Sequence, residues 1–87
     1  MLPYRLKEAR LKAGLSQQQL GVLAGIDEAT ASARMNQYER GVHTPDFELV
    51  CRLAAVLNTP TSYFYTVEDD LAEIILTYAR RKNTDAF

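Results

Sequence analysis

The 87-residue chain has one cysteine, one histidine and no tryptophan. A single cysteine cannot form an internal disulfide, and Cys51 with His43 supplies too few ligands for a metal cluster. No apolar run is long enough to cross a membrane, and the first residues do not resemble a secretory signal. We therefore expect a cytoplasmic protein with no membrane partner, stabilised by the packing of one small hydrophobic core.

The chain also lacks the patterns that mark common catalytic sites. It has no glycine-rich phosphate loop, no nucleophile elbow and no pair of carboxylates with an identifiable cleft. Cys51 lies in an apolar segment, where a buried thiol is a better interpretation than a nucleophile. We expect neither an enzyme nor a bound cofactor.

Charge is nearly balanced, with 10 Lys and Arg against 11 Asp and Glu. This balance argues mildly against nucleic acid, because DNA-binding domains are more often basic. However, basic residues outnumber acidic ones before residue 45, and acidic residues dominate after it. A binding face needs only local positive potential, so we expect modest non-specific DNA affinity with a shallow salt dependence.

The spacing of apolar residues predicts an all-α fold with no strands. Segment 46–57 is apolar nearly all round, which is typical of a central helix. The expected helices cover residues 3–13, 17–24, 28–40, 46–57 and 68–81, with a short helix around Tyr63 and Phe64 and a frayed tail at 83–87. The side chains expected to face inward from the first three helices are Leu6, Ala9, Arg10 and Ala13, then Leu20 and Leu23, then Ala31, Met35 and Tyr38.

Residues that favour helix ends lie at these boundaries. Ser16, followed three residues later by Gln19, is a capping-box pattern. Gly14, Gly25 and Gly41 each follow an expected helix, where glycine can adopt the left-handed conformation that ends it. Two short helices joined by a tight turn can present a helix to the major groove of DNA, although any small helical bundle can show the same spacing.

Two further helix starts are marked by acidic residues. Asp27 is expected to cap the third helix, where its carboxylate also suits the positive helix end. Thr44 is expected to cap the fourth helix, with Pro45 at the first helical position and Asp46 beside it.

Taken in order, several segments resemble the phage-repressor family, the Cro/lambda-repressor or XRE-type helix-turn-helix proteins. The resemblance spans residues 5–64 and implies a compact five-helix domain whose third helix reads DNA, usually as a homodimer on an inverted repeat. The matching segments are residues 5–10 (RLKEAR), 14–20 (GLSQQQL), 25–26 (GI), 38–41 (YERG), 45 (P) and 53–57 (LAAVL).

The chain departs from the family pattern in two places. Gly21 stands where alanine is usual, at a cost of about 0.5–1 kcal/mol in helix propensity. The segment from Asp27 to Glu39 is also about four residues longer than the family spacing, which corresponds to one extra turn at the start of the third helix.

The outward face of the third helix is the expected reading surface. The resemblance places base-reading positions at Ser32, Ala33 and Gln37, and helical spacing adds Thr30 and Arg34 to the same face.

The side chains suit particular bases. Arg34 can contact guanine, Gln37 or Asn36 can contact adenine, and Ala33 can touch the thymine methyl group. The alternative for Arg34 is a surface cation paired with an acid at the start of the same helix, and for Asn36 a solvated or helix-packing amide.

Phosphate contacts are expected on both sides of this helix. The start of the second helix, at Gln17 and Gln18, offers backbone amides to an anion. Arg40, His43 and Thr44 lie in the following loop and can reach the DNA backbone from the other side. The alternative is that these side chains simply face water.

The resemblance also implies a structural ion pair between Arg10 and Glu39, because matching positions in the family tie the first helix to the end of the third. Removing one partner of a buried pair costs about 3–5 kcal/mol, whereas an exposed pair is worth less than about 1 kcal/mol.

The last helix extends beyond the family unit and carries an apolar stripe. The stripe can serve as a homodimer surface that places two recognition helices about 34 Å apart, or it can fold back onto the domain. The expected division is a DNA-binding domain at 1–66, a C-terminal dimerisation helix at 67–82 and the tail at 83–87. The stripe consists of Val67, Leu71, Ile74, Ile75 and Tyr78.

The leading hypothesis is a DNA-binding transcriptional regulator, and its simplest mechanism is repression by occupying a promoter. The competing hypothesis is an antitoxin or adaptor that uses the same fold, and its acidic C-terminal half, to bind a protein partner such as a toxin. The fold alone does not separate the two.

Overall fold

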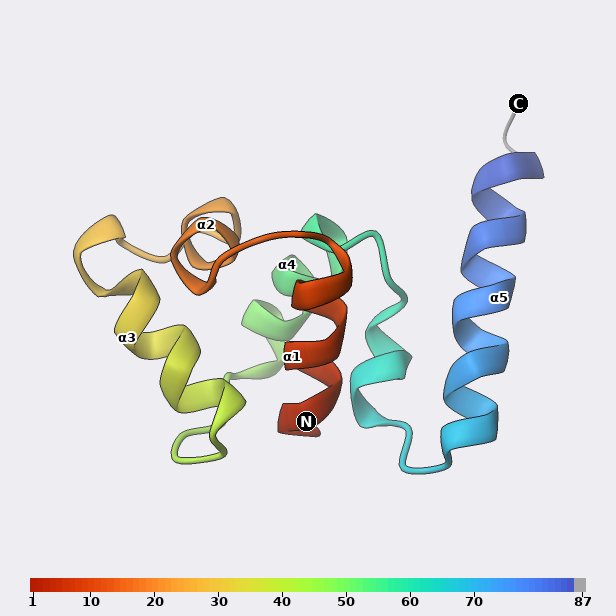
Figure 1. Ribbon diagram of the computed structural model, residues 1–87, viewed down its shortest axis with the longest axis horizontal. Coiled ribbons are helices and arrows are strands. Elements are labelled where there is room, and N and C mark those ends of the chain that lie inside the picture. The colour runs from red at the N-terminus through yellow and green to blue at the C-terminus, as the bar shows by residue number, and fades with distance from the viewer. Residues whose placement is uncertain (86–87) are drawn as a thin grey trace.

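The computed structural model describes the backbone of residues 1–85 and the side chains of residues 1–82. Every regular element in this range is helical, which confirms the expected all-α class. Figure 1 shows α3 at one end of the molecule and α5 at the other, with α1 and α4 between them. The elements are α1 (Pro3–Lys12), α2 (Gln17–Leu23), α3 (Glu28–Glu39), α4 (Phe47–Val56), the short 3-10 helix η1 (Thr61–Tyr65) and α5 (Asp69–Asp85).

The first helix boundaries lie where the sequence predicts them. Ser16 Oγ accepts a hydrogen bond from the Gln19 amide at 3.0 Å, and Gln19 Oε1 accepts from the Ser16 amide at 2.8 Å, so the capping box is formed. Gly14, Gly25 and Gly41 have φ angles of 71°, 94° and 74°. These left-handed conformations end α1, α2 and α3.

The expected cap of the fourth helix is wrong by two residues, and the helix begins at Phe47 rather than at residue 46. Asp46, not Thr44, is the cap of α4, and its Oδ1 accepts from the Leu49 amide at 2.8 Å. Pro45 therefore precedes the cap and is buried rather than occupying the first turn. The carboxylate reaches the third helical amide, which is the geometry that an N-cap requires.

The core forms between α1, α2, α3, α4 and η1, with a contribution from α5. Its largest fully buried side chains are Leu6, Leu20, Met35, Val50, Leu53 and Phe64.

Two residues expected to face inward are exposed, and so is Phe47, in the segment expected to be apolar nearly all round. Leu23 is 61% exposed, because the two-turn helix α2 uses Leu20, Gly21 and Ala24 for its core contacts. Ala13 is the exposed cap residue of α1. The central helix α4 buries only one face, which leaves Phe47 64% exposed at its start.

Gly21 has a packing role that the sequence does not reveal. A Cβ atom at this position would lie 2.9 Å from Ala31 Cβ and 3.1 Å from Met35 Cγ. Because α2 and α3 cross this closely, the glycine that lowers helix propensity in α2 also allows α3 to pack against it.

Helix α5 packs against the domain on one side only. Ala72 is buried, and Ile75 and Leu76 are partly buried against the core. Ile75 therefore does not belong to the exposed stripe, whereas Leu71 and Tyr78 do.

The end of α5 lies farther along the chain than Arg81. The helix continues to Asp85, so the backbone of residues 83–85, which was expected to fray, is helical. Residues 86 and 87 lie outside the described part of the chain. None of the described helices is long and apolar enough to span a membrane.

Candidate nucleic-acid interface

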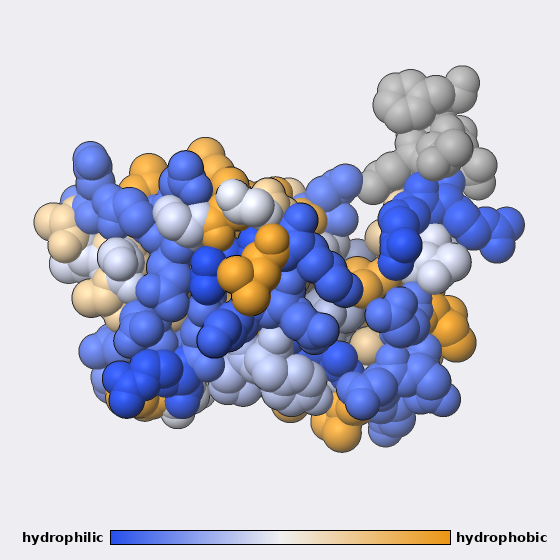
Figure 2. All heavy atoms as spheres, in the orientation of Figure 1, coloured by the Kyte–Doolittle hydropathy of each residue, from blue (hydrophilic) through white to orange (hydrophobic). Residues whose placement is uncertain are grey.

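Helix α3 has one buried face and one exposed polar face. Ala31, Met35 and Tyr38 face the core, as expected from their spacing. Hydrophilic side chains cover much of the region of α3 and the following loop in Figure 2. Two of the six residues expected to read bases, Asn36 and Gln37, are partly buried. The other four are exposed: Thr30, Ser32, Ala33 and Arg34.

The start of α3 is held in place by short-range contacts. Asp27 Oδ1 accepts from the Ala29 amide at 3.4 Å, and Thr30 Oγ1 donates to the Asp27 carbonyl at 3.3 Å. Gln18 Nε2 donates to the Glu28 carbonyl at 3.2 Å and so links α2 to the first turn of α3. The long segment from Asp27 to Glu39 is thus one cap residue followed by a continuous 12-residue helix.

Arg34 lies against Tyr38, one turn farther along α3. Its Nε and Nη2 both donate to the tyrosine hydroxyl, at 3.2 and 2.7 Å, and its guanidinium lies 5.7 Å from the centre of the ring. The alternative of a pair with Asp27 or Glu28 is therefore wrong for this structure. The tyrosine hydroxyl thus fixes the direction of the guanidinium of the exposed Arg34.

The two glutamines at the start of α2 use their side chains within the protein. Gln17 Nε2 donates to Glu39 Oε1 at 3.2 Å, and Gln18 contacts Glu28 as described above. The backbone amides of Gln17 and Gln18 therefore remain as the candidates for a phosphate contact. This part of the expected interface offers fewer donors than it would if the two side chains were free.

The loop after α3 brings Arg40, His43 and Thr44 to the surface, where all three are exposed. The loop is attached to α3 because the Gln37 carbonyl accepts from the Val42 amide at 3.0 Å and from the His43 amide at 3.4 Å. The residues expected to contact phosphate in this loop therefore lie directly after the end of the candidate reading helix.

The structure contains the ion pair between Arg10 and Glu39 that the resemblance implies. Arg10 Nε lies 2.5 Å from Glu39 Oε2, and Nη2 lies 2.9 Å from Oε1. Only 10% of the Arg10 side chain and 3% of the Glu39 side chain are exposed. The hydrogen bond to Glu39 raises the pKa of Arg10 although burial opposes this. A third bond, from Nη1 to the Leu15 carbonyl at 2.9 Å, fixes the guanidinium between α1, the turn before α2 and the end of α3.

The comparisons with known proteins decide the family. Residues 6–64, more than half of the chain, match the model of the family HTH_3, described as helix-turn-helix. The chain belongs to this helix-turn-helix family. No curated protein matches the chain significantly. Among solved structures, it is similar to that of the transcriptional regulator BswR, with 56% identity, a TM-score of 0.86, and coverage of 91% of this chain and 78% of that chain.

In this helix-turn-helix domain, α2 and α3 are the two helices and Gly25 lies in the turn between them. The end of α2 is also bonded to α4, because Arg52 Nε donates to the Ala24 carbonyl at 2.8 Å. The close approach at Gly21, this bond and the ion pair at Glu39 thus help to set the orientation of α3, together with its buried core face.

Arg5 is a structural residue whose role the sequence pattern does not reveal. It is 5% exposed, and its Nη2 donates to the Thr66 carbonyl and to Asp69 Oδ1, both at 2.9 Å. Its guanidinium also lies 4.9 and 5.4 Å from the ring centres of Tyr4 and Tyr63. Burial alone would lower the pKa of Arg5, but the bond to Asp69 and the neighbouring charges raise it overall. Arg5 thereby holds the segment that leads from the helix-turn-helix domain into α5.

Proposed function

We propose that this protein is a sequence-specific transcriptional regulator that inserts α3, residues 28–40 with its end cap, into the major groove of double-stranded DNA. The observation that carries this proposal is the exposed polar face of α3, on a helix whose opposite face is fixed by buried contacts. A major groove admits one α-helix and offers a distinct pattern of donors and acceptors at each base pair. The similarity to the solved structure of BswR, a transcriptional regulator, supports the same assignment.

The roles of the side chains follow from their chemistry. Gln37 or Asn36 would pair with adenine and Ala33 would contact a thymine methyl group, while Thr30 and Ser32 can donate to or accept from several bases. Arg34 would pair with guanine, and Tyr38 would fix the direction of its guanidinium.

Phosphate contacts would orient the domain on the duplex without reading sequence. The amides of Gln17 and Gln18 would lie on one side of the groove, and Arg40, His43 and Thr44 would lie on the other. Few of these groups are cationic, so the salt dependence of binding would be shallow.

A homodimer is the form in which the protein would act. Two copies of α3 would read an inverted repeat whose half-sites are about 34 Å apart, which is one DNA turn, or a whole number of turns apart. Occupancy of such a site within a promoter would exclude polymerase, so repression is the simplest outcome.

Selection of binding sites from a random pool of DNA duplexes tests the proposal. The parent chain would be run beside Arg34→Ala and Gln37→Ala. Lys12→Ala is the matched control, because it removes one charge from a residue beside Leu57 and Leu76, on the α4 and α5 side of the domain.

The expected result is an enriched inverted repeat whose preferences change at defined base pairs in the two α3 variants and not in the control. An absence of enrichment at low salt would instead favour the antitoxin or adaptor, a protein-binding module on the same fold. Altered affinity without altered preference would show that α3 contacts only the DNA backbone.

A further inference from the structure

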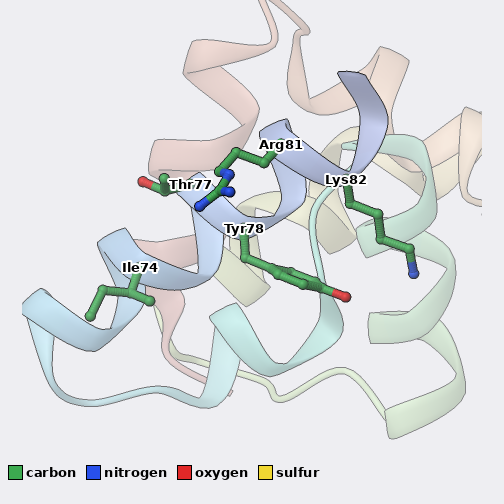
Figure 3. Close-up of a pocket in the computed structure, with 5 residues that line it drawn as sticks. All are labelled: Ile74, Thr77, Tyr78, Arg81 and Lys82. Carbon is green, nitrogen blue, oxygen red and sulfur yellow. The ribbon is translucent and has the colours of Figure 1, made fainter. Parts of the chain in front are cut away.

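The outer face of α5 carries an exposed apolar seam. Leu71, Ile74 and Tyr78 are 45%, 62% and 59% exposed and follow one another at spacings of three and four residues. Such spacing places side chains along one side of a helix, as in helices that pair with another helix. Figure 3 shows Ile74, Tyr78 and Arg81 along α5, with Lys82 projecting beside Tyr78.

The two ends of this seam carry opposite charges. Asp70 lies in the first turn of α5 and is exposed, whereas Arg81 and Lys82 lie near the other end and are also exposed. A helix with an acidic start and a basic end is complementary to a second copy of itself that runs in the opposite direction. It is not complementary to a copy that runs in the same direction, because equal charges would then lie side by side.

We propose that α5 pairs in antiparallel fashion with α5 of a second copy of this chain. The proposal rests on the homodimer of the proposed function and specifies its interface. Pairing centred at the level of residue 76 places Ile74 against the partner's Tyr78. The same register places Asp70 near the partner's Arg81, and Leu71 near the aliphatic part of the partner's Lys82, because residues on the same side of the seam face each other in an antiparallel pair.

The opposite half of α5 does not compete for this role, because it already packs on the domain. Ala72 is buried, and Ile75 and Leu76 contact the core. Asp69, next to Asp70, is already bonded to Arg5 at 2.9 Å. Of the two acids in the first turn of α5, Asp70 is therefore the one left for a partner, and Asp69 attaches this turn to Arg5 of the helix-turn-helix domain.

The location of α5 leaves the DNA-reading surface free. Figure 1 places α3 and α5 at opposite ends of the molecule, whose longest dimension is 38 Å. Pairing through α5 thus leaves both copies of α3 uncovered, as simultaneous reading of two half-sites requires.

Charge reversal of the full-length chain tests the pairing without DNA. The dissociation constant of the dimer would be measured by sedimentation equilibrium for the parent, Asp70→Lys, Arg81→Asp and the double variant. Each single reversal converts two symmetric attractions into two repulsions, and we expect it to weaken the dimer about tenfold. The double variant restores both pairs and should return to within about threefold of the parent.

The matched control is Glu48→Lys, which makes the same charge change as Asp70→Lys in the first turn of another helix, α4. It should leave the dimer unchanged. An equimolar mixture of Asp70→Lys and Arg81→Asp should also dimerise more strongly than either variant alone, because the mixed pair is complementary at both contacts.

Two results would overturn the proposal. One is a parent chain that stays monomeric. The other is a dimer whose dissociation constant Asp70→Lys leaves unchanged. Parallel pairing would give this result, because residue 70 then faces residue 70 of the partner and like charges meet in both the parent and the variant. Neither result affects DNA recognition by α3, which the site selection tests separately.

Discussion

Arg34 and Tyr38 are joined by two hydrogen bonds from one edge of the guanidinium to a single hydroxyl oxygen, at 3.2 and 2.7 Å. Tyr38 is 6% exposed, so its ring is a fixed support, whereas Arg34 lies at the surface. The pair connects the packing of the core to the direction of a candidate base-reading side chain.

Tyr38→Phe is expected to keep the buried ring and remove only this support. The loss of the hydroxyl should lower the free energy of unfolding by about 0.5–1.5 kcal/mol, while the preference at the base pair read by Arg34 becomes weaker. Thermal unfolding and site selection measure the two effects. Tyr65→Phe, in η1, is the control. An unchanged base preference in Tyr38→Phe would show that base recognition by Arg34 does not depend on the Tyr38 hydroxyl.

Glu39→Ala tests the buried ion pair. The substitution leaves the Arg10 guanidinium buried without its carboxylate, so the free energy of unfolding should fall by about 3–5 kcal/mol. Urea denaturation measures this loss, and Glu48→Ala, which removes an exposed carboxylate from α4, should change stability by less than about 0.5 kcal/mol. A loss below about 1 kcal/mol in Glu39→Ala would contradict a structural role for the pair.

Gly21→Ala tests the close approach of α2 and α3. Alanine favours a helix by about 0.5–1 kcal/mol, but its Cβ would lie 2.9 Å from Ala31 Cβ. We expect a net destabilisation of about 1–3 kcal/mol, because the two helices must separate or the side chains must shift. Adding Ala31→Gly should recover part of the loss, and a Gly21→Ala variant more stable than the parent would disprove the packing role.

Arg5→Met tests the attachment of α5. Methionine keeps the apolar volume but loses the bonds to the Thr66 carbonyl and Asp69, so stability should fall by about 1.5–3 kcal/mol. Amide hydrogen exchange should accelerate in α5 more than in α4. The control is Lys7→Met, on an exposed position of α1, and equal acceleration throughout the chain would argue against a local attachment.

The sequence predicts the helices well because their ends are set by local chemistry. The capping box at Ser16 and the glycines at 14, 25 and 41 act within a few residues, so their effects can be read from neighbouring positions. The sequence alone does not distinguish Thr44 from Asp46 as the cap of α4, because both side chains can accept a hydrogen bond from a helical amide and the path of the backbone determines which one does.

Burial was less predictable, because it depends on which elements cover a helix. Leu23 and Phe47 are apolar, yet no helix packs over them sufficiently to bury them. Arg5 bonds to a carbonyl 61 residues away, and a backbone acceptor leaves no signal in the sequence. For the candidate site, periodicity predicts which face of α3 is exposed. It does not predict the hydrogen bond from the Gln17 side chain to Glu39, which joins residues on different helices.

The most direct measurement of the central claim is the ratio of affinities for the selected duplex and for a scrambled duplex of equal length, at physiological salt. If α3 reads bases, the selected duplex should bind at least about a thousandfold more tightly. Equal affinity for the two duplexes would contradict sequence-specific recognition.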